Sequence, residues 1–371
     1  MSSKRRALLA SVCVIFAVDA ARAQPPNYDF DFVTVGDAGN PGHAPTPNGL
    51  FGRRGAVNYD YRIAKFEIKS SQWMEFLNAY SSAPGDPYSF WAVHGGFTPD
   101  PNYPGPGFQW IPISAQSGDW PVIGITWRQA ARYVNWLHND KAPTLAALDT
   151  GAYDTTTWGN GPLGPGTFSD EHTHLPGAKY WIPTLDEWLK AAYWDPNRYG
   201  TGQGGYWDYV NSSNQELVTG LPGQGQTSAG LDIGINGAYD IPLGSYPDQM
   251  SPWGLLDLSG GGSEWTEEVH GTATVSYARF FKGRAAGLAG VISAGADLDL
   301  FWIPGSEHPG FGGAMSFRIA SSVPSPTSLC VIGSVTVLFG LKRKRSPCVG
   351  RFRGVRMSCS RSWTVAADRM P

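Results

Sequence analysis

The chain has 371 residues, among them 47 glycines, 29 prolines and 15 tryptophans, and its formal net charge is −3. This composition is typical of a loop-rich globular protein with aromatic anchors, and it argues against a helical bundle or a disordered chain. The charge is uneven: residues 24–326 contain 15 Lys and Arg against 29 Asp and Glu, about −14 in all, whereas both ends are basic. Because such a body would be repelled by phosphate groups, we expect no nucleic-acid partner.

Residues 1–23 have the order of a secretory signal peptide. Three basic residues at 4–6 precede an apolar run over 7–18, and an Ala-Arg-Ala sequence at 21–23 provides a small-residue cleavage site before Gln24. We therefore expect the protein to be exported, to the cell envelope or beyond it.

The four cysteines lie only near the ends of the chain. Cys13 falls inside the predicted signal peptide, and Cys330, Cys348 and Cys359 follow the body. The body from residue 24 to 328 therefore has neither a disulfide nor thiolate chemistry.

A short apolar segment near the C-terminus predicts attachment to a membrane. Residues 323–326 (Val-Pro-Ser-Pro) precede an apolar run at 329–341 and a basic cluster at 342–345. This order resembles the PEP-CTERM sorting signal of exported bacterial proteins, with serine in place of the usual glutamate, and it implies sorting machinery as a partner. As a helix the run would reach about 20 Å, less than a bilayer core of about 30 Å, and a simple anchor with its basic side left inside is the alternative. We expect the basic tail at 346–371 to be disordered.

The first part of the body predicts two strands and a helix. Residues 29–40 and 59–68 alternate apolar and polar side chains, as strands do. A helix is expected from Ser70 or Ser71, which are natural N-cap residues. Apolar residues at helical spacing would form its buried face: Trp73, Phe76, Leu77 and Tyr80.

Two further helices are expected, each begun by a capping box. Thr126 and Gln129 would start one helix after an apolar strand at 120–125, and that helix would end near 138–139. Thr184 and Glu187 would start the other. Their buried faces would be Ala130, Tyr133, Val134 and Leu137 in the first, and Leu185, Trp188, Leu189 and Ala192 in the second. Residues 279–284 indicate a weak strand, and residues 316–320 close the domain.

The stretch from Trp253 to Glu268 combines an apolar run, three consecutive glycines and a tryptophan beside acidic residues. It shows neither a helical nor a strand period. Taken alone, it is typical of a buried strand that turns into a tight loop, where backbone approaches backbone or an ion. A purely structural turn is the simpler interpretation.

Five motifs in this order resemble the formylglycine-generating enzyme (sulfatase-modifying factor) domain over residues 29–322. The motif at 181–192 is similar to the family's most recognisable helix entry, and 254–265 matches its glycine-asparagine-valine-tryptophan-glutamate-tryptophan hallmark in part. The other three motifs are 66–78, 121–133 and the Phe-Arg pair at 317–318.

The resemblance implies an α+β fold, the family's variant of the C-type lectin fold, with two or three helices against small mixed sheets. It predicts one domain over 24–322, followed by the anchor segment 323–345 and the tail 346–371. Active members oxidise a substrate cysteine to formylglycine with copper held by two cysteines, in the interval that corresponds to 283–315 here. That interval has no cysteine, and His308 alone cannot replace a pair of thiolates. The chain also departs from the family at Gly261, where asparagine is usual, at Ser263, where tryptophan is usual, and at 282–285.

We therefore expect a non-catalytic, exported member that acts as a binding or structural module on an unknown envelope ligand, without copper. The family's structural calcium predicts a calcium ion near the hallmark, with Glu264 and Asp257 as ligands and Asp240 nearby in sequence. A metal-dependent oxygenase on the same fold is the alternative. Its ligands would come from His94, His138, His172, His174, His270 and His308, with Glu264, Glu267 and Glu268. A metal cluster of Asp170, Glu171, His172 and His174 is a weaker possibility, because such spacing in a loop is more typical of solvated surface.

Overall fold

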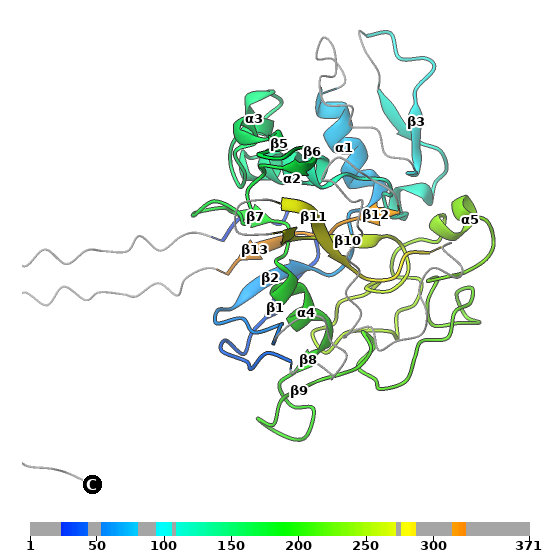
Figure 1. Cartoon of the computed structure of the whole chain (residues 1–371). Helices are drawn as coiled ribbons and strands as arrows, with labels where there is room; N and C mark the ends of the chain where they lie inside the picture. Colours follow the sequence, from blue (N-terminus) through cyan, green and yellow to red (C-terminus); the bar gives the residue numbers. More distant parts are fainter. Residues whose placement is uncertain are drawn as a thin grey trace, which may run out of the picture. The chain divides into compact units, whose positions relative to one another are not determined.

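A computed structural model describes residues 24–43, 53–80, 94–105, 109–271, 276–286 and 314–323 (Figure 1). The chain divides into two units, 1–326 and 327–371, and the second lies wholly outside the described residues. The signal peptide, the apolar run at 329–341, all four cysteines and His308 also lie outside them. The domain boundaries and the export signals therefore stay predictions.

The described part of the chain is mixed α+β, with short elements separated by long loops. Its α-helices are α1 (Ser70–Tyr80), α2 (Trp127–His138), α3 (Ala146–Asp149), α4 (Leu185–Tyr193) and α5 (Ile235–Tyr239), with 3-10 turns η1 (Ser117–Asp119) and η2 (Thr155–Thr157). Its strands are β1 (Phe32–Val35), β2 (Tyr61–Ala64), β3 (Phe97–Pro99), β4 (Trp110–Pro112), β5 (Asn160–Gly161), β6 (Gly164–Phe168), β7 (Tyr180–Trp181), β8 (Trp194–Asp195), β9 (Gly205–Tyr206), β10 (Ser263–Gly271), β11 (Ser276–Lys282), β12 (Met315–Ser316) and β13 (Ala320–Ser322). Among the described residues no helix has the length and apolar character needed to cross a membrane.

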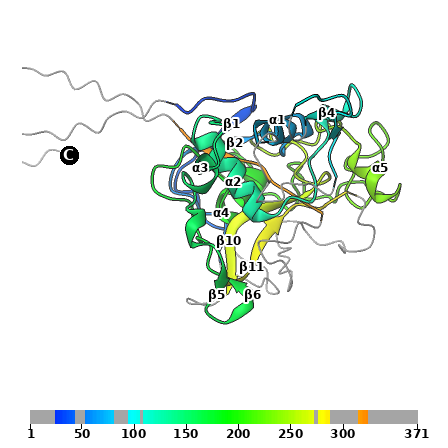
Figure 2. The same ribbon diagram turned by 90° about the horizontal axis from the view of Figure 1, so that it is seen from above.

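Two small sheets organise the domain. The first has the order β1-β2-β13-β7 and is antiparallel throughout, so the end of the domain pairs with its beginning. The second has the order β12-β10-β11-β6-β5 and contains one parallel pair, β10 with β12. Figure 1 shows α1, α2 and α3 on one side of the strands and α4 on the other, and Figure 2 shows β10 and β11 extending toward β5 and β6.

An aromatic core joins α1, α2 and the segment before β13. Trp73 and Phe76 of α1 contact Tyr133 of α2, with ring centroids 5.5 and 5.2 Å apart, and Phe317 lies edge-on to Tyr133 at 5.7 Å. Every residue predicted for the buried faces of α1, α2 and α4 is buried. The helical spacing in the sequence therefore identified these three core faces correctly.

Both predicted capping boxes are present. Thr126 accepts a hydrogen bond from Gln129 N, Thr184 accepts one from Glu187 N, and each partner side chain returns to the backbone N–H of the threonine. Such a cap contributes about 1 kcal/mol. The caps therefore fix where α2 and α4 begin rather than how they pack.

The strand predicted at 120–125 does not form. Its backbone N–H groups bond to three separate segments: Val122 to Ile68, Ile123 to His94, and both Gly124 and Ile125 to Met315. A regular strand needs one partner with a constant register. Residues 121–125 are buried, but their backbone groups bond to several neighbouring segments instead of joining one ladder.

The stretch 253–268 also differs from the expectation, because its strand follows the glycines rather than preceding them. Leu255, Leu256 and Leu258 are buried in a non-repetitive segment, and β10 begins only at Ser263. Gly260 and Gly261 have φ values of +102° and +63°, which glycine adopts readily. The glycines therefore turn the chain into β10, which lies between β12 and β11 in the second sheet.

Candidate functional site

A buried ion pair connects the start of β10 to the segment before β13. Arg318 Nε and Nη2 donate to Glu264 Oε2 and Oε1, each at 2.5 Å, and neither residue has any exposed surface. Trp188 Nε1 also donates to Glu264 Oε2, at 2.9 Å. Both oxygens of this carboxylate are thus occupied by protein donors, so a calcium ion could reach Glu264 only by displacing Arg318 or sharing its acceptors.

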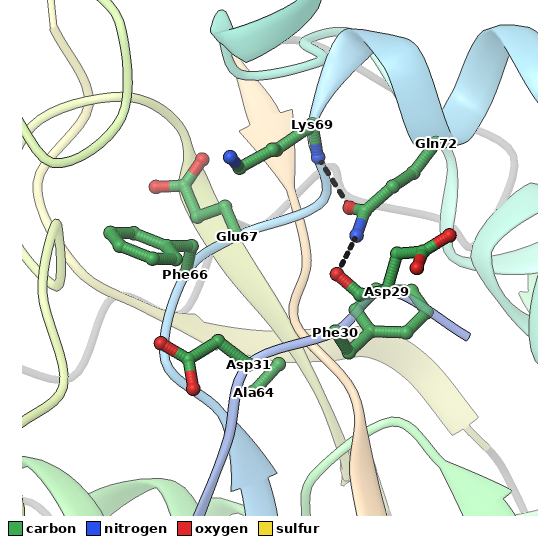
Figure 3. Close-up of a pocket in the computed structure, with 8 residues that line it drawn as sticks. All are labelled: Asp29, Phe30, Asp31, Ala64, Phe66, Glu67, Lys69 and Gln72. Atoms are coloured by element: carbon green, nitrogen blue, oxygen red, sulfur yellow. Dashed lines mark hydrogen bonds between the residues drawn. The ribbon is translucent and has the colours of Figure 1, made fainter. Parts of the chain in front are cut away.

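A second buried carboxylate lies beside this pair. Glu67 precedes α1, is 1% exposed, and accepts hydrogen bonds from Gly262 N at 3.2 and 3.1 Å. Burial and then the charge of Glu264 raise the pKa of Glu67 well above its usual range, although Arg318 opposes the shift. Figure 3 shows Glu67 together with Asp29 and Asp31 around a small pocket, and the three carboxylates point in different directions instead of converging.

Asp257, the other predicted calcium ligand, is held by a backbone donor. Its Oδ2 accepts from Gly244 N at 2.6 Å, and its φ is +56°. Burial raises its pKa to about 6, although the Gly244 hydrogen bond and Arg318 oppose the shift. Asp240 instead pairs with His94, at 2.9 Å. In the described ranges, no three His, Cys, Asp or Glu side chains converge as metal ligands would.

The described histidines among those proposed for the alternative oxygenase do not share one set of partners. His94 bonds Asp240, and His138 Nδ1 accepts from Lys179 N at 3.2 Å. Burial, followed by the charge of Arg279, lowers the pKa of His172. The side chain of His270 and all of His308 lie outside the described residues.

His174 and Glu267 form a pair at the inner face of β10. The backbone N–H and ring Nδ1 of His174 lie 2.9 and 3.0 Å from Glu267 Oε1, and the Tyr153 hydroxyl donates to the same oxygen at 2.5 Å. The His174 ring also stacks on Trp181, with centroids 4.5 Å apart. Burial lowers the pKa of His174, but the hydrogen bond and charge of Glu267, with the charge of Glu187, raise it overall.

The family profile of the sulfatase-modifying factor enzyme 1-like domain matches residues 51–296. The chain belongs to this family. The match confirms the fold class expected from the five motifs. The match does not extend to the sorting tail, which stays a prediction. No curated protein matches the chain by sequence.

Three solved structures are similar to this sulfatase-modifying factor domain. CarF is 17% identical with a TM-score of 0.44, over 80% of this chain and 99% of its own. Variable protein 1 of Treponema denticola is 15% identical with a TM-score of 0.47, and the match covers 79% of this chain and 95% of that protein's chain. PvdO from Pseudomonas aeruginosa is 13% identical with a TM-score of 0.41, and the match covers 81% of this chain and 97% of the PvdO chain.

Sequence reasoning missed Glu67 as a member of the buried cluster. Nothing in its local pattern distinguishes it, because its partner Gly262 lies 195 residues away. It also missed the arrangement of two adjacent acidic pairs, 186–187 and 267–268, although both pairs are visible in the sequence. The sequence signal that could have indicated this arrangement is a pair of consecutive acidic residues in a capped helix and a second such pair in a buried strand.

Proposed function

We propose that this domain is an exported, non-catalytic member of the sulfatase-modifying factor family that serves as a binding or structural module. One observation carries the proposal: residues 51–296, which match the family, contain no cysteine. The family's oxidation uses copper held by two cysteines, and copper(I) prefers soft thiolate ligands. No cysteine lies among the described residues, so the family's pair of thiolate ligands has no counterpart there.

The hallmark glutamate supports the same proposal. Glu264 is fully buried and bound by Arg318 and Trp188, so its role in this chain is to join β10, α4 and the segment before β13. Fold and activity are separable within a family, because a site can be lost while its scaffold is kept. Export and attachment through the tail at 323–345 belong to the proposal and rest on the sequence pattern alone.

An aldehyde assay tests the proposal directly. The purified chain would be incubated with copper, oxygen and a cysteine-containing sulfatase peptide, and the product would be captured with an aldehyde-reactive probe. A family enzyme that has its cysteine pair, treated identically, shows that the conditions support turnover. We expect no aldehyde from this chain, and aldehyde formation above the metal-only background would overturn the proposal.

The oxygenase alternative is tested by metal analysis. Among the described residues His94, His138 and His174 have different partners, so no observation favours a shared metal site. Iron and copper would be quantified after aerobic and anaerobic loading and gel filtration. Stoichiometric retention of either metal would revive the alternative.

A further inference from the structure

Two adjacent acidic pairs place four carboxylates between α4 and β10. Asp186 and Glu187 lie in the first turn of α4, and Glu267 and Glu268 lie in β10. In each pair one residue faces inward: Glu187 and Glu267 are 0% and 1% exposed. The side chains of Asp186 and Glu268 are 35% and 33% exposed.

The two inner carboxylates are fully engaged by the protein. Glu187 accepts from Thr184 N and Trp181 Nε1, and Glu267 accepts from the Tyr153 hydroxyl and from His174. They hold the fold together and cannot turn outward without breaking these bonds. The outer pair is therefore the part that a ligand could reach.

Arg54 fixes the outer carboxylates but leaves acceptor capacity. Its Nε donates to Asp186 Oδ1 at 2.9 Å, and its Nη1 and Nη2 donate to Glu268 at 3.3 and 2.7 Å. Gly55 N also donates to Asp186 Oδ1, at 2.6 Å. Within the described part of the chain no donor reaches Asp186 Oδ2. Two carboxylates facing one guanidinium leave a net charge of −1.

These outer carboxylates line a cleft of about 640 Å³, together with Asn58, Tyr59 and Thr173. This volume is in the range of small-molecule sites. Tyr59 is 43% exposed, and its hydroxyl donates to Glu187 Oε1 at 3.0 Å. Donation to a carboxylate makes the phenol ring more electron-rich, and such a ring attracts a cation over its face.

We propose that this cleft binds an organic cation, a primary ammonium or a guanidinium group. The cation would donate to Asp186 Oδ2 and Glu268 and pack on the exposed ring of Tyr59. An anionic ligand would meet repulsion from both carboxylates, since Arg54 is already paired with them. The first turn of α4 offers no anion site either, because Asp186 and Glu187 already occupy it.

The proposal rests on the proposed binding function and gives it a ligand class. A free polyamine and a basic side chain of a peptide would present the same cationic group. None of the described residues that line the cleft comes from the interval in which the family carries its cysteines. Loss of cation binding and detection of aldehyde are therefore separate readouts, and either proposal can fail alone.

Calorimetric titration of the purified full chain tests the inference. The probes are putrescine, a lysine-containing tripeptide amide, glucose oligomers and citrate. We expect the two amines to bind and the sugar and citrate not to bind. The polyamine source is favoured if putrescine binds more tightly, and the peptide source if the tripeptide does. Absence of amine binding at millimolar concentration, or binding of sugar as tight as that of amine, would overturn the proposal.

Variants locate the binding. Asp186→Asn keeps Oδ1 for Arg54 and Gly55 and is expected to weaken amine binding about tenfold, as is usual for a lost charge-assisted hydrogen bond. Tyr59→Leu, which removes the ring, is expected to weaken it several-fold and remains informative if Asp186→Asn does not fold. Glu75→Gln removes one carboxylate from an exposed pair with Lys141, outside the cleft lining, and should leave the affinity unchanged. Unaltered affinity in folded Asp186→Asn and Tyr59→Leu proteins would refute the assignment.

Discussion

Glu67 lies directly against Gly261, so close that a Cβ at position 261 would be 2.7 Å from Glu67 Oε1. Gly261 occupies the hallmark position where the family usually has asparagine, and its φ is +63°. Asparagine tolerates this backbone conformation, so backbone geometry alone does not explain the glycine. The carboxylate of Glu67 instead fills the space that a side chain at 261 would need.

We predict that Gly261→Ala is more destabilising than Gly254→Ala. Both positions have positive φ, but an added Cβ at Gly254 meets no atom within 4 Å, whereas at Gly261 it meets Glu67. Gly254→Ala should therefore show only the backbone strain, about 1 kcal/mol. Gly261→Ala should add a steric penalty of about 1–3 kcal/mol. Urea unfolding of both variants measures the difference, and equal losses would show that Glu67 moves aside freely.

The ion pair of Glu264 and Arg318 should be essential for folding. Arg318→Met would leave Glu264 buried without its cation and next to Glu67, and breaking such a pair reduces the free energy of unfolding by about 3–5 kcal/mol. Lys179→Met, which removes the cation of the exposed pair with Asp140, is the control and should change it by less than about 1 kcal/mol. Thermal or urea unfolding measures both. A loss for Arg318→Met as small as that for Lys179→Met would contradict the structural role of the buried pair.

The parts of the fold that depend on local pattern were predictable from the sequence. The buried faces of α1, α2 and α4 and both capping boxes follow from residues within one helix turn of each other. The segment at 120–125 was mispredicted because its hydrogen-bond partners come from three distant places. An apolar run shows that a segment is buried, but it does not show whether one neighbour or several will pair with it.

The candidate site was less predictable, because its residues come together only through tertiary contacts. The sequence singled out Glu264 within the hallmark as a calcium ligand, but a calcium ligand and a structural anchor look the same in sequence. The partner that distinguishes these roles, Arg318, lies 54 residues away. Arg54 and Glu268, which share the cleft, are 214 residues apart. Pairings over such distances leave no periodic trace in a single sequence.

Asp257→Asn is predicted to stabilise the protein above about pH 6. The folded-state pKa of Asp257 is raised from 3.8 to about 6, so its neutral form stabilises the fold below pH 4 and this contribution is lost as pH rises through 6. Asparagine stays neutral, can accept from Gly244 N and suits the positive φ of this position. Urea unfolding at pH 4 and at pH 7.5 should show a larger free energy of unfolding for the variant than for the wild type only at the higher pH.

The same variant tests the predicted calcium site. If calcium were bound through Asp257, the substitution would destabilise the protein in the presence of calcium, and excess EDTA would lower the Tm of the wild type. If no calcium is bound, the hydrogen bond to Gly244 and the raised pKa predict the opposite, a stabilised variant and a Tm that EDTA does not change. Melting curves of both proteins with calcium and with EDTA distinguish the two outcomes.

His174 should make the stability fall as pH rises above neutrality. Its charged form is favoured by Glu267 from β10 and Glu187 from α4, while Arg279 of β11 donates to the carbonyl of Glu267 and remains charged throughout. Because the folded-state pKa of His174 is raised above the unfolded value, its contribution is fully present below about pH 6.5 and is lost as pH rises through the folded-state pKa.

The test compares His174→Gln with His138→Gln over pH 5.5–9. The advantage of the wild type over His174→Gln should shrink as pH rises. His138 should behave in the opposite way, because burial and then Lys179 lower its pKa, and its ring nitrogen accepts a hydrogen bond from Lys179 N in the neutral form. The free energy of unfolding of the wild type, relative to that of His138→Gln, should therefore increase as pH rises. Urea unfolding at each pH measures both slopes, and slopes of the same sign would contradict the assignment of His174 as the charged partner of Glu267.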